Sequence, residues 1–283
     1  MKTKIFVFSS SGLDYISHVP QITVIPDVIT SMYNEDYYEG NELTPLQHYE
    51  RLRNDKYYNP TISTVDSDYI NELIDNALAN SYDRFVFFIN DNDIVNYSPC
   101  VSKISEERRE LDITILRINA LSYPLAHLVI EVEKKLRANE NLDEIISFVN
   151  SYRNSFKIYF YAPKENVLPS VKRIDFDDDV IASSTYGRVF LYDGNLIELK
   201  KDIKESNLEM LLNNYVNDVK DSKVIPFLLY TNKYSLYNEV LERKLLSIYP
   251  RIKSIKSFQV PIMLGSKVGN NAIGIGFVKK INE

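Results

Sequence analysis

The sequence predicts an α/β fold with two α/β domains, one after the other along the chain. In the first half, short apolar runs typical of buried strands alternate with amphipathic helical stretches. The second half instead has a hairpin signal and closely spaced strands. The length of 283 residues also fits two domains of about 150 residues each. We expect a parallel α/β/α sheet in residues 1–155 and a mixed sheet with helices in residues 156–283.

The first half is expected to contain four strands and four helices. The strands are continuous apolar runs, as parallel strands covered on both faces require: Ile5–Phe8, Ile22–Ile25, Phe85–Ile89 and Ile113–Leu116. A first helix begins at Pro45, where Thr44 can serve as the N-cap, and ends near Arg53. Three more helices are predicted over Asp68–Ala79, Pro124–Ala138 and Leu142–Tyr152. This alternation favours a parallel sheet with right-handed crossovers.

The second half is expected to form a mixed sheet with helices on one face. Asp193-Gly194-Asn195 separates two apolar runs and is typical of a hairpin, because Asp-Gly suits a turn that needs a positive φ. The predicted strands are Phe156–Tyr161, Arg188–Tyr192, Leu196–Leu199, Val224–Tyr230, Ile252–Val260 and Ala272–Val278. The predicted helices are Leu208–Val219 and Ser235–Tyr249. Residues 163–184 are the least structured joint, which puts the domain boundary near residue 155.

Composition excludes several classes of protein. The net charge of −6 argues against a nucleic-acid partner, since such proteins carry a basic patch. One cysteine, Cys100, excludes an intramolecular disulfide and a zinc site built from cysteines. No apolar run approaches the roughly 18 residues of a membrane span, and the N-terminus lacks the features of a signal peptide. We therefore expect a cytoplasmic protein with no integral membrane segment.

Candidates for catalysis or metal binding are few. The three histidines, His18, His48 and His127, have no metal-ligand spacing, and His127 is expected to pack within its helix. No basic residue adjoins Cys100 to lower the pKa of its thiol. We expect no catalytic residue, no metal and no cofactor.

Two hydroxyl-rich segments are candidates for binding an anion. Ser9-Ser10-Ser11-Gly12 follows the first strand, where hydroxyls and free amides can hold an oxyanion. Pro60-Thr61-Ile62-Ser63-Thr64 precedes a predicted helix and offers three further hydroxyls. Serine and threonine are also favoured as helix N-caps, so a purely structural role is the alternative interpretation of both segments.

Two acidic segments have alternative interpretations. Asp91 and Asp93 follow the Phe85–Ile89 strand, where carboxylates could hold Mg²⁺ with a phosphate. A solvated loop explains them as well. The run Asp175–Asp179 is interpreted as a solvated linker, because its like charges repel one another.

Glycines gather in one segment near the C-terminus. Only 8 glycines occur, where average usage of about 7% would give about 20, and four of them lie between Gly265 and Gly276. The segment is not a P-loop, because its lysine does not follow the second glycine. It does combine the Lys267 cation, the Ser266 hydroxyl and glycines that allow close approach just before a strand. An anionic head group near Lys267 and a glycine-rich turn with an exposed lysine are the two interpretations.

The order of these features resembles the DegV family, bacterial two-domain proteins that hold a fatty acid buried between their domains. The Gly265–Gly274 segment looks like the family's Gly-Thr-His-x-Gly-Pro-Gly-Ala-x-Gly stretch. Further segments that match in order are Lys4–Ser11, Ile22–Pro26, Tyr38–Gly40, Leu43–Pro45 with Tyr49 and Leu52, Pro60–Ser63, Phe156–Tyr161, Arg173-Ile174 and Asp193-Gly194. The resemblance covers nearly the whole chain.

The resemblance implies a non-enzymatic carrier that binds a fatty acid and presents it to a separate fatty-acid kinase. The implied ligand-binding residues are Ser10, Thr61, Ser63 and Asn96 in the first domain and Ser266 and Lys267 in the second. Arg173 is the implied contact with the partner protein.

Several family positions are changed in this chain, which keeps a second hypothesis open. The acidic residue of the family's Asp-Ser-Thr turn is Ser9 here, and its C-terminal histidine is Lys267. Its Thr-Ser-Gln-Pro loop reads Ile62-Ser63-Thr64-Val65, and its Ser-Gly-Thr-Tyr element reads Ile94-Val95-Asn96-Tyr97. The second hypothesis is a diverged binding or regulatory module that has lost the acid site. A third is an enzyme that uses phosphate or a metal at Asp91, Asp93 and the Ser9–Ser11 turn.

Overall fold

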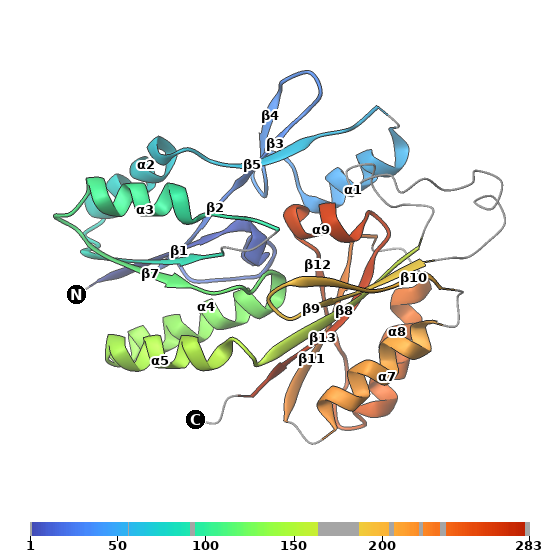
Figure 1. The fold of residues 1–283 in the computed structure, drawn as a ribbon. Helices are drawn as coiled ribbons and strands as arrows, with labels where there is room; N and C mark the ends of the chain where they lie inside the picture. Colours follow the sequence, from blue (N-terminus) through green and yellow to red (C-terminus); the bar gives the residue numbers. More distant parts are fainter. Residues whose placement is uncertain are drawn as a thin grey trace. The chain divides into compact units, whose positions relative to one another are not determined.

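The structure is a computed structural model of the chain (Figure 1). It describes residues 2–55, 57–90, 94–163, 187–203, 207–220, 223–232 and 236–280. The chain forms two compact units, which contain residues 1–44 with 58–154 and residues 45–57 with 155–283. The first contains a parallel sheet and the second a mixed sheet, so the fold class predicted from the sequence is confirmed.

The first unit is built on four parallel strands in the order β2-β1-β6-β7. They are β1 (Thr3–Phe8), β2 (Ile22–Ile25), β6 (Arg84–Ile89) and β7 (Asp112–Arg117). The side chains of the two central strands are almost completely buried, since both faces of the sheet are covered by helices. Each strand overlaps the apolar run that predicted it.

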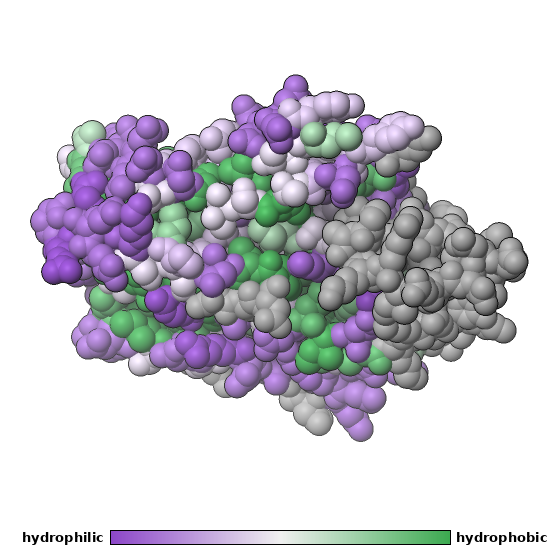
Figure 2. Space-filling view, turned by 45° about the horizontal axis from the view of Figure 1, so that its top comes forward, coloured by the Kyte–Doolittle hydropathy of each residue, from purple (hydrophilic) through white to green (hydrophobic). Residues whose placement is uncertain are grey.

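Figure 1 shows two pairs of helices on opposite faces of this sheet. One pair is α2 (Ser67–Ala79) and α3 (Ser98–Glu107), and the other is α4 (Ser122–Arg137) and α5 (Leu142–Tyr152). Figure 2 shows hydrophilic residues gathered over α2 and α3, as expected for helices with one face in solvent. His127 packs between α4 and α5, with its Nδ1 atom 3.2 Å from the Tyr152 hydroxyl, so its predicted packing role is confirmed.

The same unit also contains a small antiparallel sheet, whose strands lie between β2 and β6 along the chain. Its strands lie in the order β4-β3-β5 and are β3 (Asp27–Thr30), β4 (Asp36–Tyr38) and β5 (Thr61–Thr64). Strands β3, β4 and β5 were not predicted from the sequence. These strands have three or four residues and mix polar with apolar side chains, so no apolar run marks them.

The second unit is built on six strands in the order β10-β9-β8-β13-β11-β12. They are β8 (Phe156–Pro163), β9 (Gly187–Tyr192), β10 (Leu196–Ile203), β11 (Val224–Tyr230), β12 (Lys256–Gln259) and β13 (Ile273–Lys279). Among the described strands of this sheet, β11 and β12 are the one pair that is parallel. Strands β9 and β10 form the predicted hairpin, and Gly194 in its turn has φ 120°.

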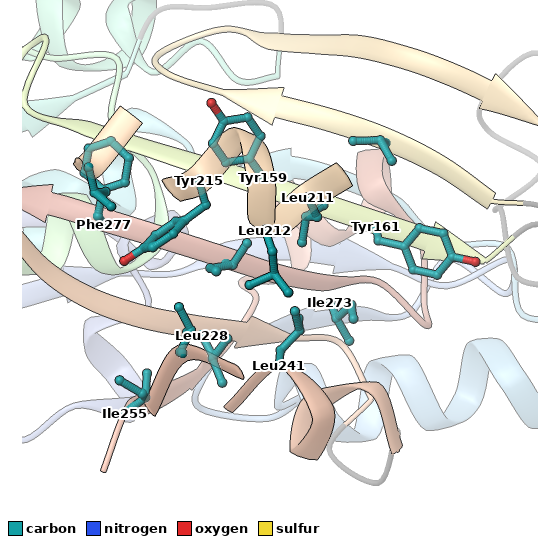
Figure 3. Packing of buried hydrophobic residues seen from close by; sticks show 14 residues of the cluster. Tyr159, Tyr161, Leu211, Leu212, Tyr215, Leu228, Leu241, Ile255, Ile273 and Phe277 are labelled. Atoms are coloured by element: carbon teal, nitrogen blue, oxygen red, sulfur yellow. The ribbon is translucent and has the colours of Figure 1, made fainter. Parts of the chain in front are cut away.

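Helices α7 (Asn207–Val219) and α8 (Leu236–Ile248) pack against this sheet and enclose the core of the second unit. Figure 3 shows Leu211, Leu212 and Tyr215 of α7 beside side chains of β8 and β13. Burial of each large aliphatic or aromatic side chain of this kind stabilises the fold by roughly 1.5–3 kcal/mol. The predicted strand Ile252–Val260 is shorter than expected, because the chain turns at Ile252 and buries Ile255 in the core before β12 begins.

Two further helices belong to the second unit, although one comes from the first half of the chain. Helix α1 (Pro45–Asn54) contacts the segment that leads into α9 (Ile262–Val268), where the Tyr49 hydroxyl donates to the Val260 and Pro261 carbonyls at 3.0 and 3.1 Å. Residues 45–57 therefore group with residues 155–283, whereas the division of the sequence into 1–155 and 156–283 had them in the first domain. That division stays a prediction about domains.

Candidate functional site

The carboxyl ends of β1, β2 and β6 bring a group of polar side chains to one edge of the parallel sheet. Ser9–Ser11 form a single 3₁₀ turn directly after β1, Asp27 follows β2, and Asn90 follows β6. All of these side chains are buried. Strand β1 pairs with β2 on one side and β6 on the other, so the strand order reverses here, which is where open α/β sheets bind their ligands.

The first serine of the turn organises this edge. The backbone N–H of Asp27 donates to Ser9 Oγ at 2.9 Å, and the Ser9 hydroxyl donates to Glu39 Oε2 at 3.3 Å. Ser11 Oγ accepts from the Leu13 N–H at 3.2 Å. Two of the three serines therefore hold the local backbone in place, although neither is an N-cap, since Phe8 and Gly12 occupy the N-cap positions of the two 3₁₀ turns. Ser10 takes part in none of these three bonds.

The Asp27 carboxyl is paired with a tyrosine from 70 residues away in the sequence. The Tyr97 hydroxyl donates to both Asp27 carboxylate oxygens at 2.9 Å, and the Tyr97 ring stacks on Phe8 with ring centroids 3.6 Å apart. Burial raises the pKa of Asp27 to about 7, although the bonds from Tyr97 and Ser9 oppose that shift. Burial and the charge of Asp27 raise the pKa of Tyr97 well above its usual value, while the Ser10 side chain lowers it. The Asp27 carboxyl therefore gains or loses its proton in the neutral pH range.

Two further carboxyl groups lie near this pair. Glu39 is 1% exposed and accepts from Ser9. Burial raises the pKa of Asp14 to about 6, and the charge of His18 partly offsets that shift. Gly40 lies so close to Asp14 that a Cβ at this position would be 2.9 Å from the Asp14 Cγ. We call Asp14, Asp27, Glu39, Ser9 and Tyr97 the carboxyl cluster.

The predicted ligand-binding residues of the first unit are only partly brought together. Ser10 is buried beside Tyr97 in the carboxyl cluster. Thr61 and Ser63 are exposed on β5, two residues apart on one face and paired with Thr30 and Val28 of β3. Asn96 is also exposed, and its Oδ1 accepts from the Ser98 N–H at the start of α3. Thr61 and Ser63 therefore point to solvent, and Asn96 has a structural bond.

The glycine-rich segment near the C-terminus is partly helical. A glycine-rich turn with an exposed lysine was one of the two interpretations of this segment, whereas in the structure α9 includes both Gly265 and Lys267. The Ser266 hydroxyl donates to the Met263 carbonyl at 2.7 Å within this helix. Lys267 is exposed and forms no ion pair with the described residues. Of the two predicted ligand contacts in α9, the Ser266 hydroxyl is used within the helix, whereas the Lys267 ammonium group is available to a ligand.

An arginine from α1 contacts the end of the same segment. Arg53 Nη1 donates to the Asn270 carbonyl at 3.2 Å, and burial lowers the pKa of Arg53. The Asn270 side chain is 5% exposed, and its Oδ1 atom has no partner among the residues that the structure describes.

The remaining candidates lie outside the described residues or show no binding arrangement. Arg173, Asp91, Asp93 and the run Asp175–Asp179 belong to the former group. Burial raises the pKa of the Cys100 thiol, which makes its thiolate less available. Within the described ranges, no three His, Cys, Asp or Glu side chains are grouped so that they could hold a metal ion. No helix in that part of the chain is long and apolar enough to cross a membrane.

Most of the carboxyl cluster was not predicted from the sequence. Asp27 and Glu39 are acidic residues that no sequence motif connects, and Asn90 directly precedes the more conspicuous Asp91 and Asp93 in the sequence. An aspartate directly after Pro26 at the end of a buried strand was the available signal. Tyr97 lies just before α3, a helix that the sequence patterns also did not reveal.

Comparison with known proteins gives a consistent result. A family model described as "Uncharacterised protein, DegV family" matches residues 2–169. A DegV domain-containing protein of Clostridium perfringens is 20% identical over 264 residues, which cover 88% of each chain.

Solved structures share the fold at low sequence identity. A fatty acid binding DegV family protein from Streptococcus agalactiae matches with a TM-score of 0.79 and 18% identity, over 99% of this chain and 100% of that one. DegV, a fatty acid binding protein from Bacillus subtilis, matches with a TM-score of 0.75 and 16% identity over the same shares of the two chains. A fatty-acid-binding DegV family protein from Thermus thermophilus matches with a TM-score of 0.76 and 15% identity, again over 99% and 100%.

Proposed function

Because this chain belongs to the DegV family, we propose that it binds a long-chain fatty acid and has no enzymatic activity of its own. The observation that carries this proposal is the fold shared over 99% of the chain with DegV family proteins described as fatty acid binding. The physical requirements for binding are modest. An acyl chain gains about 0.8 kcal/mol for each buried methylene, so the head group needs only a few fixed polar partners.

We assign the head-group contacts to the polar residues that the sequence singled out. The Ser10 hydroxyl, beside the carboxyl cluster, would donate to the head group, with Thr61, Ser63 and Asn96 as further donors. Ser266 and Lys267 of α9 would supply a hydroxyl and a cation. A permanent cation can donate to the carboxyl group of the acid, and it partly offsets head-group hydrogen bonds lost where Ile62 and Ile94 replace hydroxyl residues.

The biological role that follows is that of a carrier. We propose that the chain acts in the cytoplasm and presents its bound acid to a fatty-acid kinase, with Arg173 contacting that partner. A pull-down with such a kinase, comparing wild type with Arg173→Ala, would test this step. Equal capture of both proteins would contradict the assignment of Arg173.

The direct test of the proposed function is the lipid content of the purified protein. We expect organic extraction followed by mass spectrometry to recover about one fatty acid per folded chain, because a ligand with a buried acyl chain dissociates slowly. A folded protein that carries no fatty acid, and takes none up when a series of chain lengths is offered, would contradict the proposal.

Lys267 distinguishes this function from a diverged module without an acid site. That alternative is favoured by Asn96 and Ser266, whose side chains already bond to their own helices. If the Lys267 ammonium donates to the carboxyl group of the ligand, Lys267→Ala should weaken fatty-acid affinity about tenfold, the usual scale for a charged hydrogen bond. Lys253, an exposed lysine of the same unit, supplies the matched control, and Lys253→Ala should change the affinity less than twofold. Equal affinities for the two variants would favour the diverged module.

A further inference from the structure

One buried side chain at the edge of the parallel sheet has no hydrogen bond. Asn90 follows β6 and is 1% exposed. Neither its Nδ2 nor its Oδ1 has a hydrogen-bond partner in the described chain. Leaving both atoms of a buried amide unpaired is unfavourable, and such groups in folded proteins normally have a partner. Asn90 is therefore a candidate for contact with a group that the protein itself does not supply.

The position of Asn90 connects it with the carboxyl cluster. Val7 of β1 lies opposite Phe88 of β6, so the two strands bring the serine turn and Asn90 to the same edge. The backbone N–H of Tyr97 donates to the Asn90 carbonyl at 3.0 Å. This bond holds the backbone of Tyr97, a member of the carboxyl cluster, beside that of Asn90. The amide thus lies where open α/β sheets receive a ligand.

The charges around this edge are predominantly negative. Asp14, Asp27 and Glu39 bring three carboxyl groups from different elements. Burial raises the pKa of Asp14 to about 6 and of Asp27 to about 7. Among the described residues, the groups that shift these two pKa values include no lysine or arginine. They are Tyr97, Ser9 and Asp14 for Asp27, and His18 for Asp14.

The helix packed against the serine turn adds no charge to balance them. Helix α4 contacts this turn and the next one, Leu13–Tyr15, and before Glu131 it contains no lysine, arginine or acidic residue, only His127. His127 instead lies against Tyr152 of α5. Tyr123, in the first turn of α4, has its pKa raised by burial. An anionic head group would therefore meet like charges here, and would do so more strongly as the pH rises.

We propose that Asn90 binds the head group of the ligand, and that this head group is an uncharged carboxylic acid. The Asn90 Nδ2 would donate to the carbonyl oxygen of the acid, and the acid O–H would donate to Asn90 Oδ1. One planar group would thereby satisfy both buried atoms. A carboxylate has only acceptors and would leave Oδ1 unpaired. This inference rests on the proposed function, since it takes a fatty acid as the ligand, and adds the binding residue and the protonation state.

Three ligands that each contain twelve carbon atoms test the inference on lipid-free wild-type protein between pH 6 and pH 8. Dodecanoic acid should lose about tenfold in affinity per pH unit, because its protonated fraction falls at that rate above its own pKa. Dodecanamide offers a donor and an acceptor without titrating, so its affinity should change less than threefold. Dodecanesulfonate, a permanent anion with acceptors only, should bind at least a hundredfold more weakly than the amide. Acid affinity that is independent of pH, or sulfonate affinity equal to that of the amide, would overturn the inference.

Variants then assign the contact to Asn90. Asn90→Leu should weaken dodecanamide binding at least tenfold, whereas Asn76→Leu, at an exposed position of α2, should change it less than twofold. If Asn90→Leu does not fold, the ligand series on the wild type still decides about the protonation state. Wild type that binds neither acid nor amide would overturn the proposed function as well. Tight binding of the acid regardless of pH and of Asn90 would overturn only this inference.

Discussion

Replacing Gly265 by alanine is expected to destabilise the second unit by about 3 kcal/mol, the upper range for overpacking a filled core. A Cβ at this position would lie 1.7 Å from the Tyr49 hydroxyl oxygen and 2.5 Å from its ring carbon Cζ. Tyr49 has no room to move, because its side chain is fully buried and its hydroxyl donates to the Val260 and Pro261 carbonyls. Either the ring leaves these bonds or α9 shifts away from α1.

Chemical denaturation followed by circular dichroism would measure this effect. Ser266→Ala is the matched control, since it changes the next residue of the same helix and removes only a bond to the Met263 carbonyl. It should cost about 0.5 kcal/mol or less. Gly265→Ala should also lower the free energy of unfolding much less in a Tyr49→Ala background than in the wild type, because the two changes affect the same contact. Equal costs in the two backgrounds would show that Tyr49 is not the obstacle.

Asn in place of Asp27 is expected to remove most of the pH dependence of the stability of the first unit. Asp27 has a pKa of about 7 in the folded chain, against a usual value of 3.8. The folded state therefore binds more protons than the unfolded state between these two values, and the free energy of unfolding falls as the pH rises through them. The shift of about three units corresponds to at most about 4 kcal/mol, fully lost above pH 7.

Urea titrations at pH 5 and pH 8 would check the result. The wild type should be less stable at pH 8, and Asp27→Asn should be nearly as stable at pH 8 as at pH 5. Asp14, with its pKa of about 6, titrates in the same window and would leave a smaller residual slope. Asp68→Asn, an exposed aspartate in the first turn of α2, should retain the wild-type slope. An Asp27→Asn protein with the wild-type slope would show that the buried Asp27 carboxyl is not the source of the pH dependence.

Most of the sheet could be predicted from the sequence, because buried strands leave an unambiguous pattern. The runs at Ile22–Ile25 and Val224–Tyr230 match β2 and β11 to the residue, since continuous apolar residues of that length have few other stable positions. The Asp193-Gly194 turn likewise predicted its hairpin through a local backbone requirement. These features depend on neighbours in the sequence, which is why composition and periodicity find them.

The candidate site was much less predictable. The cluster joins Asp27 to Tyr97, 70 residues apart, and no spacing rule connects two such positions. Asn90 could not be predicted for a different reason. It became a candidate because its buried amide has no hydrogen-bond partner in the described chain, which only the structure can show. Thr61 and Ser63 were singled out by their hydroxyl pattern, and the structure adds that both lie on one exposed face of β5. Their role as ligand contacts stays a prediction.

By itself, the sequence determined an α/β protein with a parallel sheet first and a mixed sheet second, and it marked the glycine-rich segment as unusual. Only the tertiary structure decided that helix α1 packs with the second unit, that Gly265 is required by Tyr49, and that the buried Asp27 and Glu39 carboxyl groups gather with the half-buried Asp14 near the end of β1. The physical reason is range. Strands and turns follow from interactions between near neighbours, whereas a close contact or a shifted pKa depends on side chains that only the complete fold brings together.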